Sequence, residues 1–213
     1  MHLVTNTVEI ADQGPVIPVI VIDDAASAVD LAHALIAGGI RVLEITLRTT
    51  VAFDAIGAVA QAVPRAIVGA GTVRTPDDAA RARDVGASFA VSPGFSPTVA
   101  DACDRYSLPL LPGVATAGEV MTASEAGFSF MKFFPAQAAG GVPLLSALAS
   151  PFADVSFCPT GGIGPGNAAS YLSLPNVRCI GGSWIVPADA IAANDWPRIT
   201  QLASAASQLS GEA

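Results

Sequence analysis

Short apolar runs alternate with longer stretches of helical character along nearly the whole chain. Many of the runs contain β-branched residues, and each is short enough to be one buried strand rather than a helix. This pattern predicts strands at Val16–Ile22, Val42–Thr46, Ala66–Ala70, Phe89–Val91, Leu108–Leu111, Phe128–Phe133, Val155–Cys158 and Val177–Ile180.

The stretches between these runs are rich in alanine and predict helices. Their expected bounds are Ala25–Ile36, Val51–Val63, Asp77–Val85, Thr98–Tyr106, Ala117–Ala126, Val142–Leu148, Asn167–Leu172 and Asp195–Leu209. Thr75 and Pro76 precede the third of these helices as an N-cap and a first-turn proline. We expect the first dozen residues to add one short helix that covers the floor of the fold.

A regular alternation of strands and helices predicts a parallel sheet with crossover helices. A chain of 213 residues suits one domain, here 1–213, and closure of the sheet is favoured at this length. No G-x-G-x-x-G follows the first strand, which disfavours an open dinucleotide-binding sheet. The predicted fold class is therefore α/β, a (β/α)8 TIM barrel with a short N-terminal helix.

The composition agrees with strands buried on both faces. Charged residues make up 13% of the chain, against about 25% in average soluble domains. Hydrophobic residues reach 52%. We therefore expect a large interior, or a surface that another subunit partly covers.

Charge and patterning argue against several classes of partner. The net charge is −8 with a single lysine, whereas nucleic-acid binding needs clustered Lys and Arg side chains. No uncharged apolar stretch reaches the ~20 residues of a membrane span, and the N-terminus lacks a signal-peptide pattern. We expect a cytoplasmic enzyme with a small-molecule substrate and without nucleic-acid or membrane partners.

The cysteines and histidines do not predict a disulfide framework or a metal site. Cys103, Cys158 and Cys179 are odd in number and lack C-x-x-C spacing, so we expect them to fill the core. His2 and His33 are the only histidines and belong to no ligand cluster. A zinc-dependent mechanism is therefore not expected.

In barrels of this kind, catalytic groups lie on the loops that follow the strands. Lys132 ends the sixth predicted strand, inside the apolar run Phe-Met-Lys-Phe-Phe. A desolvated lysine tends to lose its proton, and the neutral amine is the nucleophile that forms a Schiff base. The alternative is a packed stem with the ammonium group in water. A catalytic role is favoured because the chain's only lysine lies in an apolar strand.

The second predicted strand carries a carboxylate at its centre. Val42, Glu44 and Thr46 share one face of this strand because side chains alternate along it. If that face lines the interior, Glu44 is a buried carboxylate that can shuttle protons. Arg48, just beyond the strand, has the guanidinium that binds a substrate carboxylate. The alternative role for Glu44 and Arg48 is a structural ion pair at the barrel rim.

Two glycine-rich segments follow the last two predicted strands. They are Thr160-Gly161-Gly162 and Gly181-Gly182-Ser183. Barrels often bind phosphate between these two loops, where glycine lets the backbone approach the oxygens. The alternative is two tight turns that need positive φ.

Four segments resemble a known enzyme family. Gly39–Arg48 and the stretch GFSFMKFFPAQAAG at 127–140 are similar to the active-site signatures of the 2-keto-3-deoxy-6-phosphogluconate aldolases, the KHG/KDPG aldolases. CPTGGIGPGN at 158–167 and CIGGSWIVP at 179–187 resemble the phosphate-binding segments of the same family. The similarity extends from about Pro15 to Leu202.

This resemblance implies a homotrimeric barrel that reversibly cleaves 2-keto-3-deoxy-6-phosphogluconate to pyruvate and glyceraldehyde 3-phosphate. The reaction belongs to the Entner–Doudoroff pathway and needs no metal or organic cofactor. By motif position, Lys132 would form the Schiff base and Glu44 would move protons. The substrate would be held by Arg48 and Thr72 at its carboxylate, by Pro93 and Phe134 along the pocket, and by Gly161, Gly162, Gly182 and Ser183 at its phosphate.

Other functions stay open on the sequence. A related aldolase would act on 4-hydroxy-2-oxoglutarate or 2-keto-3-deoxy-6-phosphogalactonate. A non-catalytic phosphate-binding barrel would keep the glycine loops but would not need Lys132 in an apolar strand beside a buried Glu44.

Overall fold

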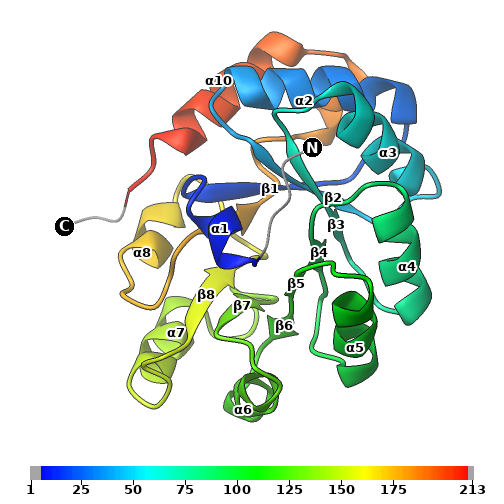
Figure 1. Ribbon diagram of the computed structural model, residues 1–213. Coiled ribbons are helices and arrows are strands. Elements are labelled where there is room, and N and C mark those ends of the chain that lie inside the picture. The colour runs from blue at the N-terminus through cyan, green and yellow to red at the C-terminus, as the bar shows by residue number, and fades with distance from the viewer. Residues whose placement is uncertain (1–5, 211–213) are drawn as a thin grey trace.

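The computed structural model describes residues 6–210 and has parallel strands at its centre with helices around them (Figure 1). The strands are β1 (Val16–Ile20), β2 (Val42–Thr46), β3 (Ile67–Gly71), β4 (Ala90–Val91), β5 (Leu110–Leu111), β6 (Gly113–Val114), β7 (Phe130–Phe133), β8 (Ser156–Pro159) and β9 (Ile180–Gly182). Within the described residues they form one sheet in the order β5-β4-β3-β2-β1-β9 and another in the order β6-β7-β8. All of the pairings are parallel.

The two sheets are joined at both ends into one curled sheet. Pro112 separates β5 from β6, and its carbonyl accepts a hydrogen bond from the Lys132 N–H of β7. At the other end, parallel bridges join Phe157 to Val177 and Thr160 to Gly181, so β8 borders β9. The chain therefore belongs to the parallel curled α/β folds.

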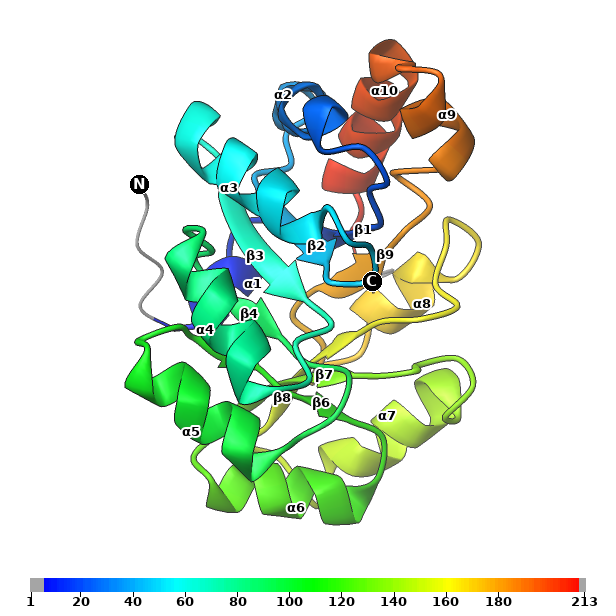
Figure 2. The ribbon, with the colours of Figure 1, turned by 90° about the vertical axis from the view of Figure 1, so that its right-hand side faces the viewer.

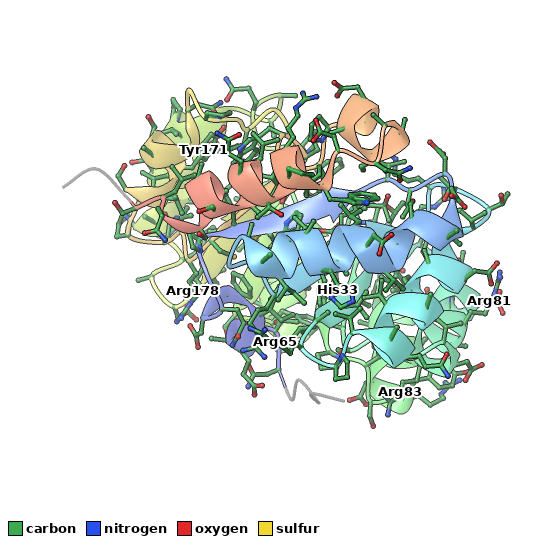
Figure 3. The ribbon with its side chains drawn as sticks, turned by 90° about the horizontal axis from the view of Figure 1, so that it is seen from above. His33, Arg65, Arg81, Arg83, Tyr171 and Arg178 are labelled. Atoms are coloured by element: carbon green, nitrogen blue, oxygen red, sulfur yellow. The ribbon has the colours of Figure 1, made fainter. Side chains whose placement is uncertain are left out.

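The helices lie outside the strands, as Figures 1 and 2 show from two sides. They are α2 (Ala28–Ala37), α3 (Ala52–Ala62), α4 (Pro76–Asp84), α5 (Pro97–Arg105), α6 (Ala117–Glu125), α7 (Gly141–Ala149), α8 (Ala168–Leu172), α9 (Ala188–Ala192) and α10 (Trp196–Ser207), with the 3-10 turn η1 (Ala25–Ser27) before α2. The helices α2 and α10 run side by side, and the exposed His33 lies on α2 (Figure 3). None of the helices between residues 6 and 210 has the length and apolar character of a membrane span.

Two capping boxes start helices at the predicted places. Thr75 Oγ1 accepts from the Asp78 N–H, and the Asp78 carboxylate accepts from the Thr75 N–H, at 3.1 and 3.0 Å. Thr116 and Glu119 repeat this arrangement before α6. Each box gives partners to N–H groups that a helix start would otherwise leave unpaired.

The interior of the curled sheet is packed separately from its outside. One cluster of buried side chains joins alternate strand residues inside the curl, among them Val42, Ile67, Phe89 and Phe130. The other cluster joins the outward-facing strand residues, such as Leu43, to the helices. The strands alternate in this way because successive side chains point to opposite faces.

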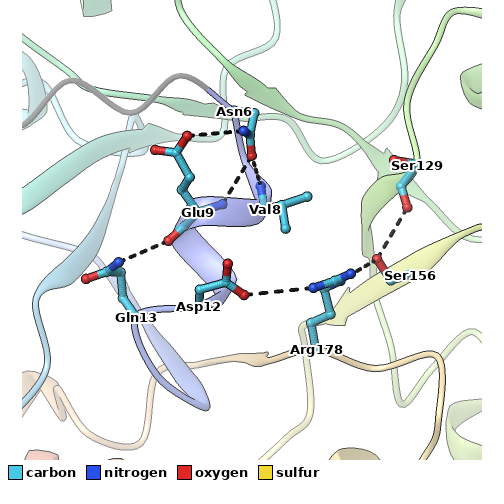
Figure 4. A network of polar contacts seen from close by, with 8 residues as sticks. All are labelled: Asn6, Val8, Glu9, Asp12, Gln13, Ser129, Ser156 and Arg178. Atoms are coloured by element: carbon cyan, nitrogen blue, oxygen red, sulfur yellow. Dashed lines mark hydrogen bonds and ion pairs between the residues drawn. The ribbon is translucent and has the colours of Figure 1, made fainter.

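A short helix, α1 (Val8–Ala11), closes the interior at the end where the strands begin. Its Ile10 and Ala11 pack against the inner cluster. Figure 4 shows the polar contacts that hold it, in which Asp12 pairs with Arg178 at 3.8 Å and Arg178 donates to Ser156 Oγ at 3.1 Å. The expected floor helix is thus confirmed for the described residues, while the predicted part at 1–5 lies outside them.

Several predicted bounds were wrong, for local reasons. The fifth strand, predicted at Leu108–Leu111, continues to Val114 but is interrupted at Pro112, which has no N–H to donate. The eighth strand is Ile180–Gly182 rather than Val177–Ile180, so Gly181 and Gly182 belong to the strand. The first strand ends at Ile20, and the short α9 was not predicted.

Candidate active site

Lys132 and Glu44 meet inside the curled sheet. The two residues are 88 positions apart, on β7 and β2, and Lys132 Nζ lies 2.9 Å from Glu44 Oε1. Their side chains are only 6% and 4% exposed. Two charges this deeply buried are tolerated only as a pair, because removing either leaves an uncompensated charge at a cost of about 3–5 kcal/mol.

The packing around Glu44 explains how a carboxylate fits in the interior. Glu44 follows Val42 by two residues and therefore points to the same inner side of β2. The neighbouring strand β3 carries glycine at 69 and 71. A Cβ atom on Gly71 would lie 2.6 Å from Glu44 Cγ and would also clash with Oε1. Gly71 thus leaves the space that the carboxylate occupies.

Phe134 lies close to Lys132, and Pro93 packs against the strand next to that of the lysine. Lys132 Nζ is 5.4 Å from the centre of the Phe134 ring, within range of a cation–π contact. Lys132 pairs with Gly113 across β6, and the backbone of Pro93 and Gly94 packs directly against Gly113. Phe134 is therefore beside the lysine, whereas Pro93 borders the neighbouring strand β6.

The glycine loops after β8 and at the end of β9 are brought together by the bridge between Thr160 and Gly181. Gly161 and Gly162 have φ values of +102° and +74°, a conformation that other residues rarely adopt. A Cβ atom on Gly161 would lie 3.4 Å from the Phe134 ring. The first loop therefore adjoins the Phe134 ring and makes a turn with positive φ, as the alternative required, whereas Gly181 and Gly182 have no positive φ and belong to β9.

In the loop after β8, successive carbonyl groups face donors of the protein. The carbonyl groups of Thr160 and Gly161 accept hydrogen bonds from Ala136 and Gln137 N–H at 2.8 and 3.0 Å. Within residues 6–210, the N–H groups of Gly162, Ile163 and Ser183 donate to no other residue. Unpaired N–H groups on such turns are suited to bind an anion.

Arg48 and Thr72 lie at the same end of the sheet, but the structure shows no contact between either of them and Lys132. Arg48 is exposed in the turn after β2, and it forms no ion pair with a described residue. The alternative Glu44–Arg48 ion pair is therefore wrong, since the partner of Glu44 is Lys132. Thr72 is half-buried directly after Gly71 and has a φ of +62°, unusual for a residue with a side chain.

Sequence reasoning placed Thr160 in a glycine-rich segment and Asn167 at the start of a helix, but it gave neither side chain a role of its own. Thr160 is 4% exposed and follows Cys158 by two positions, so it belongs to the inner face of β8, where Cys158 pairs with Lys132. Asn167 bonds the glycine loop through its side chain. A period-two extension of the strand would have found Thr160, whereas Asn167 carries no periodic signal.

Other features of the molecule lie away from this site. A cavity of about 700 Å³ opens at the opposite end of the strands, between the start of α1, α5 and residues 127–130. Among residues 6–210, no group of three or more His, Cys, Asp or Glu side chains is placed to hold a metal ion. The cavity lining includes neither Lys132 nor Glu44.

The three cysteines are free and buried, as predicted. Burial raises the pKa of the Cys103 thiol from 9.0 to about 11. A hydrogen bond with Cys158, followed by burial, holds the pKa of Cys179 well above its ordinary value. The thiols of Cys103 and Cys179 are therefore protonated at neutral pH, as expected for residues of the core.

Comparisons with known proteins point to one enzyme family. The sequence profile described as KDPG and KHG aldolase matches residues 8–202. The KHG/KDPG aldolase of Escherichia coli is 53% identical, and the alignment covers 93% of both chains.

Two solved structures share both fold and sequence. A KDPG aldolase from Legionella pneumophila, with pyruvate captured as a covalent carbinolamine intermediate, has a TM-score of 0.91 and 48% identity, covering 93% of this chain and 97% of that one. The 2-keto-3-deoxy-6-phosphogluconate aldolase of Zymomonas mobilis with 3-phosphoglycerate has a TM-score of 0.91 and 45% identity, covering 95% of each chain. The chain therefore belongs to the KDPG and KHG aldolase family, whose members are carbon–carbon lyases.

Proposed function

We propose that this protein is a class I aldolase that cleaves 2-keto-3-deoxy-6-phosphogluconate to pyruvate and D-glyceraldehyde 3-phosphate through a Schiff base on Lys132. The observation that carries the proposal is the buried contact of 2.9 Å between Lys132 Nζ and Glu44 Oε1. A nucleophilic amine needs a neighbour that takes its proton and returns it, and Glu44 is within hydrogen-bond distance.

In the proposed mechanism, Lys132 Nζ adds to the keto carbon of the substrate. Glu44 carries two protons in turn from the Lys132 ammonium group to the former keto oxygen, first to allow the addition and then to let the carbinolamine hydroxyl leave as water, which gives the iminium. In the resulting iminium, Glu44 removes the proton of the C4 hydroxyl. The C3–C4 bond then breaks, its electron pair enters the iminium to give an enamine, and the aldehyde leaves. Protonation of the enamine at C3 and hydrolysis release pyruvate and the free lysine.

The neighbouring residues receive the rest of the substrate in this proposal. Arg48 and Thr72 bind the pyruvyl carboxylate from the loops after β2 and β3. Pro93 and Phe134 line the pocket on either side of the lysine strand. Gly161, Gly162, Gly182 and Ser183 bind the phosphate, supported by the free N–H groups of the two adjoining loops.

We also propose that the strands close into a complete (β/α)8 barrel within one domain, 1–213, and that the protein is a cytoplasmic homotrimer. The bridges between β8 and β9, together with the joining of β5 and β6 at Pro112, support closure. Counting β5 and β6 as one interrupted strand gives the eight-fold arrangement. The trimer rests on the family resemblance, and sedimentation velocity tests it.

A second substrate of the same site is 4-hydroxy-2-oxoglutarate, for which the name of the Escherichia coli relative is the specific support. It shares the 2-keto acid half that Lys132 attacks. The 6-phosphogalactonate isomer differs only around the aldehyde half. Comparing kcat/KM for the three compounds ranks them as substrates. A higher value for either alternative would replace 2-keto-3-deoxy-6-phosphogluconate as the assigned substrate.

Reductive trapping tests the proposed nucleophile. The protein is incubated with pyruvate and borohydride. Its intact mass is then measured, and peptide mapping locates the modified residue. We expect one pyruvyl adduct on the peptide with Lys132, the chain's only lysine. The matched control is Lys132→Arg, which keeps the positive charge but cannot form an imine, because guanidinium stays protonated. An unmodified Lys132 in folded protein, or turnover by Lys132→Arg, would refute the mechanism.

The role of Glu44 is tested with Glu44→Gln. This variant keeps the shape of the side chain but removes the proton acceptor, so we expect kcat to fall by about 10²–10⁴-fold. The KM for substrate should change much less. An unchanged kcat would exclude Glu44 as the proton shuttle.

A further inference from the structure

The side chain of Asn167 bonds the loop that follows β8 at two places. Its Oδ1 accepts a hydrogen bond from the Gly164 N–H at 2.8 Å, and its Nδ2 donates to the Gly162 carbonyl at 3.0 Å. The amide therefore bridges the two ends of the turn from Gly162 to Gly164. An amide suits this place because one group must accept from a backbone N–H and the other must donate to a carbonyl.

The two hydrogen bonds of Asn167 fix the orientation of the peptide units in the turn. Asn167 holds the Gly162 carbonyl, just as Ala136 and Gln137 hold the carbonyls of Thr160 and Gly161. Three successive carbonyl groups are thus paired with protein donors. Within the described part of the chain, the N–H groups of Gly162 and Ile163 donate to no residue. The bonds to the carbonyls and the free N–H groups together make one side of the turn a hydrogen-bond donor surface.

A turn of this composition would not keep that orientation unaided. Gly161, Gly162, Gly164 and Gly166 give the backbone wide conformational freedom, and ordering glycine costs more entropy than ordering any other residue. Gly162 also packs against Gln137, whose side-chain oxygen accepts from Tyr171 at 2.8 Å. Asn167 and Gln137 thus both constrain the loop.

We propose that Asn167 is a positioning residue that sets the preference for phosphorylated substrates by holding the Gly162–Gly164 turn in its anion-binding orientation. Asn167 acts through the backbone and touches no reacting atom. The inference rests on the proposed function, because it assigns the turn to the substrate phosphate, and it adds the residue that makes the turn selective.

The test separates phosphate binding from chemistry at Lys132. In Asn167→Ala both hydrogen bonds are lost, and we expect KM for 2-keto-3-deoxy-6-phosphogluconate to rise about tenfold, with kcat at saturation retained. The rate of pyruvate trapping on Lys132 and the kcat/KM for unphosphorylated 2-keto-3-deoxygluconate should not change. If Asn167 had only a structural role, its loss would lower kcat, the rate of pyruvate trapping and the kcat/KM for the unphosphorylated compound together. That result would overturn the proposal.

Two further variants keep the test decisive. Asn167→Asp retains the acceptor for Gly164 but loses the donor to Gly162 and adds a negative charge, so its KM for the phosphorylated substrate should rise at least as much. Ser170→Ala, an exposed position on α8, is the matched control and should behave as wild type. An unchanged KM in both Asn167 variants would overturn the proposal, and so would circular dichroism spectra that show both unfolded while the control folds.

Failure of the proposed function would be seen separately. If the wild-type protein neither traps pyruvate nor cleaves the phosphorylated substrate, the aldolase assignment fails. Titration with inorganic phosphate then decides the role of Asn167. Binding that weakens about tenfold in Asn167→Ala supports the positioning role, whereas equal binding or none in both proteins overturns it.

Discussion

At the scale of single residues, the site depends on a small number of buried polar atoms with defined partners. The sequence predicted Lys132 and Glu44 because each interrupts an apolar strand, which is costly unless the charge is paired or used. Their contact across 88 residues could not be predicted, since it depends on which strands face each other across the interior. The same is true of Asn167, which lies in no periodic element.

The space for Glu44 gives a prediction at this scale. In Gly71→Ala the added methyl group would overlap the Glu44 carboxylate, so the side chain must move away from Lys132. Because small misplacements of catalytic groups are costly, we expect kcat to fall by about 10²-fold while the protein stays folded. The measurement is steady-state kinetics with a circular dichroism control. Gly118→Ala, where a Cβ meets open space, is the matched glycine variant and should keep full activity.

At the scale of elements, hydrophobic periodicity predicted the strands and most helices, because burial on one or both faces dominates their formation. It placed the eighth strand too early, since glycine is a poor strand former and Gly181 and Gly182 seemed to be loop. In the fold they pair with Ile17 and Pro18 of β1, and a Cβ at either position would collide with Thr160 or Trp184. Tertiary packing therefore overrides local propensity there.

Helix capping gives a prediction at the scale of elements. Thr75→Ala removes the side-chain oxygen that accepts from the Asp78 N–H at the start of α4. We expect the free energy of unfolding to fall by about 1 kcal/mol, measured by urea denaturation. Thr50→Ala, at an exposed turn position, serves as the control and should shift stability by less than about 0.5 kcal/mol. Equal shifts in both variants would show that the cap does not stabilise α4.

At the scale of the whole molecule, the candidate active site lies at one end of the curled sheet and the covering helix α1 at the other. The end where the strands begin is covered by α1, which packs on the inner apolar cluster. Lys132, Glu44 and the glycine loops lie toward the carboxyl ends of the strands. This division was predictable from the strand–helix alternation alone, because parallel strands bring all their carboxyl ends to the same edge. The thiol of Cys103 on α5 lies in the outer cluster, between the sheet and the helices.

Alkaline unfolding tests the contribution of this thiol. Cys103 has its pKa raised by burial from 9.0 to about 11, so the unfolded chain ionises first as the pH rises. The stabilisation is complete below pH 9 and is lost as the pH rises toward about 11. We therefore expect a steeper loss of stability over this range in wild type than in Cys103→Ala, measured by urea denaturation at each pH. Parallel curves would contradict the assignment.

The burial of the only lysine also determines how the protein responds to acylating reagents. Activated esters react with free amines in solution, and here the side-chain amine is 6% exposed and paired with a carboxylate. The side chain of Lys132 is thus shielded in the folded protein, so its acylation should be slow. The rate of acylation at Lys132 would report directly how often the interior opens to reagents.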